Sequence, residues 1–357
     1  MFTLKPDYLQ AQSRVNAFWN HDETDRPLLF LRYTKPDAKQ FHSKTFASHK
    51  DRWLDVEYRT QEVVHRMENT VFAADSMPVF SPDIGPEILS AIAGCPFYYE
   101  ETTTWTEPCI FDWETDAPKA IMDVKHPLFK TLERFTRLLL DAAKGKFIVG
   151  LSDFHPGADH VAALRDPQVL AMDLLDNPEE VKKKLTSSYL EYFPIFDHFL
   201  KLLKAEGMPI SSWISLTSEE SMYIPSNDFS YMISNEMFEE FFLEGIIQEC
   251  RHYGHNIFHL DGPGCLRHLD NLLAIPELHA IQWMPGAGRM EVHQWMDLYK
   301  KILSAKKSLI VYPQNLSELL LIKEHLPARG LHIDMGHVND EHEANNIIKI
   351  VEDWPVR

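Results

Sequence analysis

Apolar positions along this chain follow two patterns in alternation. Short runs of aliphatic and aromatic residues are typical of buried strands, and apolar residues spaced three or four apart are typical of amphipathic helices. From residue 127 onward the alternation is regular. The expected strands in this part of the chain cover residues 146–152, 209–216, 256–260, 279–285, 308–313 and 330–335. The expected helices cover residues 128–144, 158–175, 177–204, 235–250, 266–272, 291–303, 316–326 and 341–351.

The first part of the chain is less regular. Its pattern predicts a helix over 7–20 that closes one end of the fold, a strand over 27–33, a helical insertion over 36–70, a strand over 76–83, a short helix over 85–94 and an irregular excursion over 95–125. Alternating strands and helices favour a parallel sheet with helical crossovers. About eight such repeats predict an α/β fold, a (β/α)8 TIM barrel with an N-terminal helical extension and insertions.

The expected organisation is one domain over residues 1–357, with an extension over 1–75 and a barrel core over 76–357. A doubly wound open sheet is the runner-up architecture. Such a sheet would normally carry a glycine-rich nucleotide turn after an early strand, and the chain contains neither G-x-G-x-x-G nor G-x-x-x-x-G-K.

Composition narrows the function classes. Hydrophobic residues make up 45% and charged residues 25% of the chain, as in ordinary globular proteins, and the net charge is -18. Nucleic-acid binding needs a basic surface and is not expected. No apolar run is long enough to span a bilayer, and the first residues lack the apolar core of a signal peptide. The four cysteines are scattered without a C-x-x-C pair, which favours reduced thiols and a cytoplasmic location.

The stretch from Asn256 to Gly264 carries the most specific chemistry. His259 and Asp261 lie two residues apart at the end of an expected strand, so their side chains share one face. Active sites of such barrels form at the carboxyl ends of the strands. A metal ion, with zinc as the expected metal, would be held by His259, Asp261 and a group from the last strand end, His337 or Asp334. Alternatively, Asp261 caps the next helix and His259 forms a hydrogen bond inside the barrel.

Other polar and aromatic residues follow the strands. Asp83, Trp283, Tyr312 and Gln314 are candidate substrate-binding residues, with capping or core packing as the alternative for Asp83 and the two aromatics. Asp228, in a polar loop, is a candidate general acid or anchor for a cationic group, or simply part of an Asx turn.

One motif carries little weight. Asp153-Phe-His-Pro-Gly resembles the corrinoid-binding pattern D-x-H-x-x-G but is one residue short of it.

Several segments, in this order and spacing, resemble the uroporphyrinogen decarboxylase superfamily, whose fold is a TIM barrel. They are Gly150-Leu-Ser-Asp, Asp173-Leu-Leu-Asp-Asn-Pro-Glu-Glu-Val, Ile233-Ser-Asn-Glu-Met-Phe-Glu-Glu-Phe, His259-Leu-Asp-Gly, and Gly330-Leu-His-Ile with the helix start at 341–344. True decarboxylases of the superfamily carry an arginine-rich R-Q-A-G-R-Y segment, whereas this chain has Arg26-Pro-Leu-Leu-Phe. With a net charge of -18, a tetrapyrrole bearing many carboxylates is also a poor substrate.

The resemblance therefore implies the corrinoid-dependent methyltransferase branch. Those enzymes hold zinc with a His-x-Cys pair and a later Cys; here His259 takes the His position, Asp261 replaces the first Cys, and His337 is the expected substitute for the second. The implied function is a metal-dependent methyltransferase that moves a methyl group between a corrinoid (methylcobalamin), free or on a partner protein, and a small substrate. Asp228 and His259 are the candidate catalytic residues.

Two alternatives stay open. The first is a metal-free decarboxylase or other lyase on a small carboxylic acid, in which Asp228 or His259 protonates a carbanionic intermediate. The second is a non-catalytic barrel that binds a ligand. The oligomeric state is also open, with a homodimer as one option.

Overall fold

A largely parallel sheet forms the centre of the molecule. The computed structural model describes residues 2–286 and 291–355. Seven strands pair in the order β2-β1-β11-β10-β9-β8-β7, and all neighbours are parallel except β2, which is antiparallel to β1. These strands are β1 Leu28–Thr34, β2 Thr70–Ala74, β7 Met222–Tyr223, β8 His255–Asp261, β9 Ala280–Met284, β10 Ser308–Val311 and β11 Leu331–His337. Two further pairs are β3 Val79–Phe80 with β6 Ile148–Val149, and the hairpin β4 Phe97–Tyr99 with β5 Thr104–Thr106.

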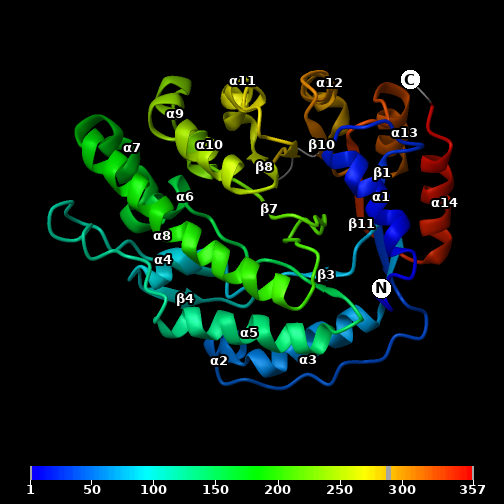
Figure 1. Cartoon of the computed structure of the whole chain (residues 1–357), viewed down its shortest axis with the longest axis horizontal. Coiled ribbons are helices and arrows are strands. Elements are labelled where there is room, and N and C mark those ends of the chain that lie inside the picture. The colour runs from blue at the N-terminus through cyan, green and yellow to red at the C-terminus, as the bar shows by residue number, and fades with distance from the viewer. Residues whose placement is uncertain (1, 287–290, 356–357) are drawn as a thin grey trace.

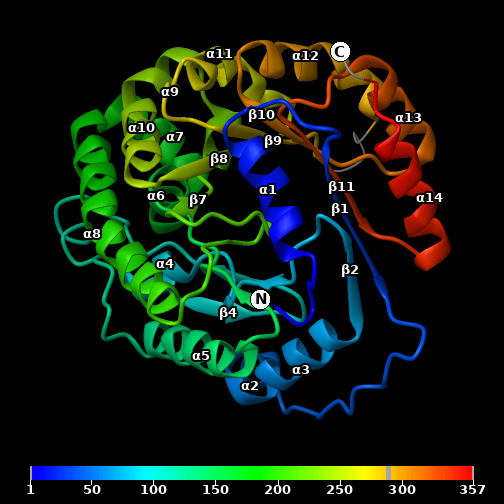
Figure 2. The same ribbon diagram turned by 45° about the vertical axis from the view of Figure 1, so that its right-hand side comes forward.

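Helices surround the strands, as Figures 1 and 2 show. In chain order they are α1 Tyr8–Trp19, α2 His49–Leu54, α3 Val56–Glu68, α4 Ile88–Ile92, α5 Pro127–Ala143, α6 Ala158–Arg165, α7 Pro167–Asp176, α8 Pro178–Ala205, α9 Asn235–Phe241, α10 Leu243–His252, α11 Leu269–Leu273, α12 Met296–Ser304, α13 Leu316–His325 and α14 Glu341–Glu352. Short 3₁₀ helices are η1 Asp228–Met232, η2 Pro263–His268 and η3 Val292–Trp295. The chain is therefore a mixed α/β fold with its apolar core between sheet and helices.

Helix α1 closes the amino-terminal end of the strands, as the sequence predicts. The Trp19 indole N–H donates to the Thr217 carbonyl at 2.9 Å, and its ring stacks on His255 at the start of β8 with centroids 4.8 Å apart. The Ser308 hydroxyl, at the start of β10, donates to the Phe18 carbonyl at 2.6 Å. Side chains of α1 therefore pack against the strand starts, so the strand ends that face away from α1 are the carboxyl ends.

The expected closed eight-stranded barrel is not present in the hydrogen-bonding pattern of the described residues. The predicted strand over 209–216 is wrong: Ser215 has a left-handed φ of 64°, and the chain turns back there to form a single antiparallel bridge between Ile210 and Ser218. The sheet continues instead through β7, within a stretch that we expected to be a loop. Beside β1, a side chain takes the place of backbone pairing. The Ser76 hydroxyl accepts from the Leu31 N–H at 2.6 Å and donates to the Leu31 C=O at 2.7 Å.

Other differences are local. The strand expected over 76–83 shortens to β3, and the helix expected over 158–175 divides into α6 and α7 at Asp166–Pro167, because proline disfavours a helical residue before it. Strand β1, inside the expected N-terminal extension, is an inner strand between β2 and β11.

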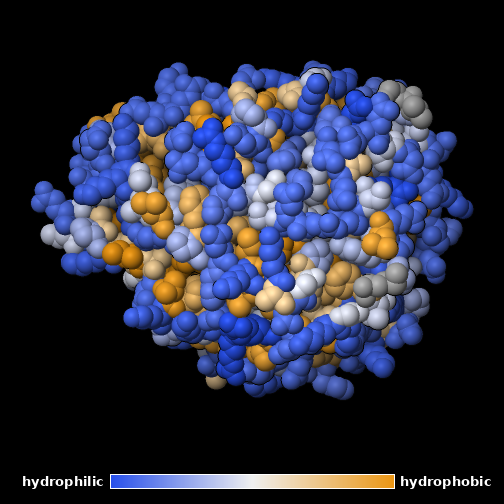
Figure 3. Space-filling view, in the orientation of Figure 1, coloured by the Kyte–Doolittle hydropathy of each residue, from blue (hydrophilic) through white to orange (hydrophobic). Residues whose placement is uncertain are grey.

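The visible face of the molecule is mostly hydrophilic, with separate apolar patches (Figure 3). Among the described residues, no helix combines the length and apolarity required to cross a membrane.

Candidate metal centre

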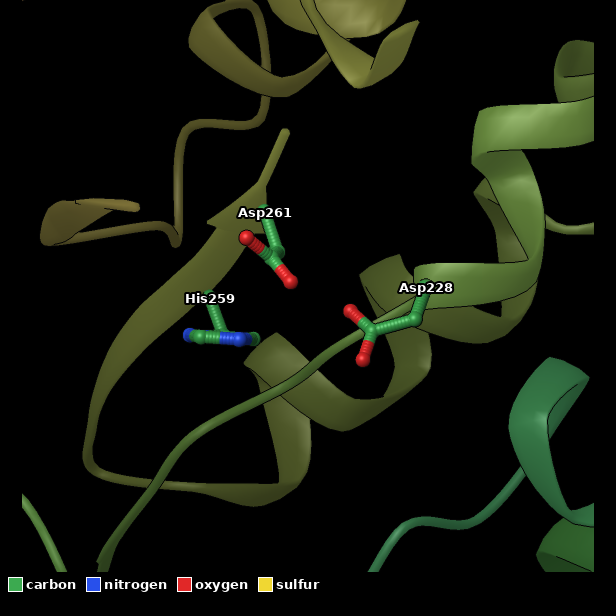
Figure 4. Close-up of side chains that lie close together, drawn as sticks. All are labelled: Asp228, His259 and Asp261. Atoms are coloured by element: carbon green, nitrogen blue, oxygen red, sulfur yellow. The ribbon is translucent and has the colours of Figure 1, made fainter. Parts of the chain in front are cut away.

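Two elements bring three ligand-type side chains together at the carboxyl end of β8. His259 and Asp261 share one face of the strand, and the chain turns sharply at Gly262, which has a φ of 79°. Asp228 begins η1 and points at them from the other side (Figure 4). One ligand atom from each of the three residues lies within 4.8 Å of the others. A single cation could therefore contact all three groups.

Hydrogen bonds fix the orientation of the His259 ring. Its Nδ1 lies 2.6 Å from the Oε1 of Gln282, the residue paired with it on β9. The Gln282 amide nitrogen in turn donates to the Tyr312 hydroxyl at 2.5 Å. A carbonyl oxygen only accepts, so Nδ1 carries the proton and the Nε2 lone pair is free for a ligand. Trp213 packs edge-on against the same ring at 5.4 Å. Such support is typical of a metal-binding histidine.

Asp228 is exposed toward two cavities, yet the pKa of its carboxyl is raised to about 6. Desolvation by the surrounding protein is the largest cause, followed by the nearby Asp159 carboxylate; Asp261 adds to the increase, and His259 and His155 oppose it. The Asp228 and Asp261 carboxylates repel each other, and a cation between them would relieve this repulsion.

A second network holds the segment that carries Asp228. Asp159, in the first turn of α6, accepts a hydrogen bond from the Phe229 N–H at 3.0 Å and another from the Ser226 hydroxyl at 3.1 Å. His155 Nδ1 lies 3.0 Å from the same hydroxyl, and its Nε2 lies 3.0 Å from Asp153. Burial disfavours a charged His155, but Asp153, Asp159 and Asp228 outweigh it and raise its pKa to about 9.

Asp228 lies between two hollows. One, of about 370 Å³, is bordered by Asp228, Asp261 and Tyr231. The other, of about 480 Å³, is bordered by Asp228, His155 and Asp159. A ligand can therefore approach the three-residue cluster.

The structure brings His259, Asp261 and Asp228 together, but it does not bring His337 to them. His337 ends β11, and its Nε2 lies 3.1 Å from the Thr34 hydroxyl instead. Strands β8 and β11 are separated in the sheet by β9 and β10, which places His337 away from the cluster. Asp228 supplies the third group in its place.

The expected substrate residues occupy different positions. Tyr312 lines a cavity of about 690 Å³ beside Gln282. Trp283 is buried and packs edge-on against Trp295, on the opposite face of β9 from Gln282. Asp83 accepts from the Gly85 N–H at 3.0 Å, as in an Asx turn, with Arg59 3.9 Å away. Gln314 is exposed and donates to the Tyr312 carbonyl at 2.9 Å.

Sequence reasoning missed Asp159. Its position at the start of a helix predicts a cap, and nothing in the sequence pairs it with residues 226–229. In the sequence His155 stands out only within the Asp153-Phe-His-Pro-Gly motif, and its part in this network depends on a contact 71 residues away along the chain.

Comparisons with known proteins give information at the level of the fold. No protein-family model matches the chain, and no curated protein matches it. Among solved structures, the chain is similar to a methyltransferase from Methanosarcina mazei, with a TM-score of 0.60, 9% sequence identity, and 99% of each chain covered. At this identity the likeness shows a shared fold over the full length and nothing finer.

Proposed function

We propose that this protein is a metal-dependent methyltransferase related to the uroporphyrinogen decarboxylase superfamily, with a barrel-type fold. It would move a methyl group between a corrinoid, free methylcobalamin or a corrinoid protein, and a small substrate. The observation that carries the proposal is the Asp228, His259 and Asp261 cluster at a strand end. The likeness of the fold to a methyltransferase supports it.

The donor set suits a divalent metal. One imidazole nitrogen and two carboxylates are ligands that Zn²⁺ accepts, and three protein ligands leave a position open for substrate. When bound, the metal would act as a Lewis acid that lowers the pKa of the substrate heteroatom. Because these donors are harder than thiolates, a hydroxyl or carboxylate oxygen is a suitable substrate atom as well as a thiol.

The chain's own residues would bind, orient and move a proton. Gln282 keeps the His259 Nε2 lone pair directed at the cluster. Asp228 comes from a separate element and faces the hollows. One Asp228 carboxylate oxygen would face the metal, and the other would accept the proton that the substrate heteroatom loses as it gains the methyl group.

Metal analysis of freshly purified protein, combined with methylcobalamin demethylation assays over thiol and phenol acceptors, tests this proposal. We expect bound zinc, activity that a chelator abolishes and zinc restores, and loss of both metal and activity in His259→Ala. His337→Ala is the matched control, because His337 is a histidine outside the cluster, and it should keep its metal. A metal-free protein whose His259→Ala variant is fully active would refute the proposal.

A metal-free lyase is the second candidate. The raised pKa of Asp228 favours it, because a carboxyl that titrates near pH 6 can also donate a proton to a carbanionic intermediate. CO₂ release from a small carboxylic acid that persists in chelator and disappears in Asp228→Ala would identify this activity.

A further inference from the structure

A larger cavity borders the metal centre on the β9–β11 side. It measures about 690 Å³ and lies at the carboxyl end of the strands, between β1, β9, β11 and helix α3. Gln282 and Trp213 line it, and both also contact His259. The two sites therefore share a wall, and a molecule in this cavity would lie beside the metal ligands.

Two arginines line this cavity, Arg32 and Arg66. Arg32 shares a face of β1 with Thr34, and Arg66 comes from the last turn of α3 and lies over the Phe80 ring at 5.1 Å. Within residues 2–286 and 291–355, neither guanidinium forms a hydrogen bond or an ion pair, whereas Arg26 and Arg165 are each paired with an aspartate. In a chain with a net charge of -18, two unpaired guanidinium groups in one hollow favour an anionic ligand.

The charge of the cavity selects the kind of anion. Asp334 is the one carboxylate among its described lining residues, and burial raises the pKa of its carboxyl, so the two arginines leave the lining net positive. A net positive lining with two guanidinium groups suits a single anionic group. Guanidinium groups match the planar geometry of a carboxylate through paired hydrogen bonds. Tyr312 accepts a hydrogen bond from Gln282, which leaves its own O–H free to donate.

The remaining wall is mixed. Met67, Phe72, Val79, Ile214 and Met284 form an apolar part, and Thr34, Thr70, Ser215 and His337 add polar groups. A cavity with a few polar groups at one side and apolar side chains elsewhere is typical of sites for small organic ligands. The wall therefore fits a molecule with an apolar body and one acidic end.

We propose that this cavity binds the carboxylate of a small organic acid with an apolar body, through Arg32, Arg66 and Tyr312. That acid is the methyl-accepting or methyl-donating substrate, an assignment that rests on the proposed function. The proposal that this cavity binds an acid does not depend on that assignment.

Calorimetric titration of the chelator-treated full-length protein at low salt tests the binding site. The probes are hexanoate and phenylacetate, with inorganic phosphate as the competing class of anion. We expect saturable binding of at least one acid, and a loss of affinity of about tenfold or more in Arg66→Gln, because a charge-assisted hydrogen-bond pair is removed. Arg137→Gln is the matched control, since Arg137 is an exposed arginine on α5, and it should bind like the parent.

Arg32→Gln should weaken binding similarly. If this change in an inner strand unfolds the protein, as circular dichroism would show, Arg66→Gln decides, because Arg66 lies at the surface end of a helix. Three outcomes overturn the inference: neither acid binds, binding is unchanged in Arg66→Gln, or phosphate binds in an Arg66-dependent way and the acids do not. Since the titration needs no metal and no turnover, binding without metal-dependent activity would reject the proposed function alone.

Discussion

At the scale of single residues, the candidate metal centre depends on which nitrogen of His259 carries the proton. Gln282 decides this, because its carbonyl oxygen accepts from Nδ1 and its amide nitrogen is already engaged with Tyr312. In this orientation the Gln282 amide contacts both His259 and Tyr312. One side chain on the neighbouring strand therefore prepares Nε2 as a ligand.

We predict that Gln282→Met lowers zinc affinity by about tenfold or more, since residues that hydrogen-bond to metal-binding histidines have effects of this size. Competition with a chromophoric chelator would measure it. Gln314→Met is the matched control, because Gln314 bonds only the Tyr312 carbonyl with its side chain, and it should bind zinc like the parent. Equal affinities in the two variants would show that Gln282 does not orient the ligand.

At the scale of elements, the start of α6 holds the segment that carries Asp228. Asp159 bonds both the backbone at Phe229 and the hydroxyl of Ser226, on either side of Asp228. The metal centre thus depends on a contact between a helix and a 3₁₀ helix 70 residues apart in the chain.

We predict that Asp159→Ala lowers both the free energy of unfolding, by about 2 kcal/mol, and the zinc affinity, because two hydrogen bonds to an ionised acceptor are lost. Asp166→Ala is the control: Asp166 accepts from two backbone N–H groups at the start of α7, so its loss also destabilises the protein. Urea unfolding measures the loss of stability in both variants, and chelator competition measures the loss of zinc affinity. If Asp166→Ala weakened zinc binding as much, positioning by Asp159 would not be specific.

Helix α6 also needs the residue before it to be glycine. Gly157 has a φ of 66°, and a Cβ there would lie 2.2 Å from the Tyr189 hydroxyl oxygen. Gly145 has nearly the same φ of 68°, with nothing within 4 Å of the added carbon. The two positions share a positive φ and differ in the space around the added carbon.

We predict that Gly145→Ala costs about 1 kcal/mol of stability through left-handed strain alone. Gly157→Ala should cost about 1–3 kcal/mol more, because Tyr189 must also move. Urea unfolding of both variants measures the difference, and equal losses would mean that Tyr189 yields without cost.

At the scale of the whole molecule, buried titratable groups make stability depend on pH. Glu249 is buried among tyrosines and accepts a hydrogen bond from the Tyr253 hydroxyl at 3.1 Å. Burial raises the pKa of Glu249 from 4.5 to about 8. The folded protein therefore keeps a proton that the unfolded chain releases, and stability falls as pH rises between these two values.

Comparison with Glu249→Gln isolates this effect, because glutamine keeps the acceptor but does not titrate. We predict that the variant gains stability relative to the parent as pH increases from about 4.5 to about 8, and that the difference is constant at higher pH. Urea unfolding across this range measures it. A difference that does not change with pH would mean that Glu249 titrates normally in the folded protein.

The sequence by itself determined most of the elements and two of the three residues of the candidate metal centre. Periodicity located α1, α5, α8 and the strands β8 to β11. Burial of one face of an element imposes a regular spacing of apolar residues within that element, so the pattern is visible in the local sequence. His259 and Asp261 were found for the same reason, since alternation along a strand puts residues two apart on one face.

Only the tertiary structure decided the rest. Whether the sheet closes depends on backbone conformations such as the left-handed Ser215, which an apolar run from 209 to 216 does not reveal. The third group of the cluster is Asp228 rather than His337, because strand order separates β11 from β8 while η1 packs against it. The partners Gln282, Asp159, Arg32 and Arg66 likewise depend on contacts between distant segments. The local sequence shows which face of an element is buried, but it does not show which residues that face contacts.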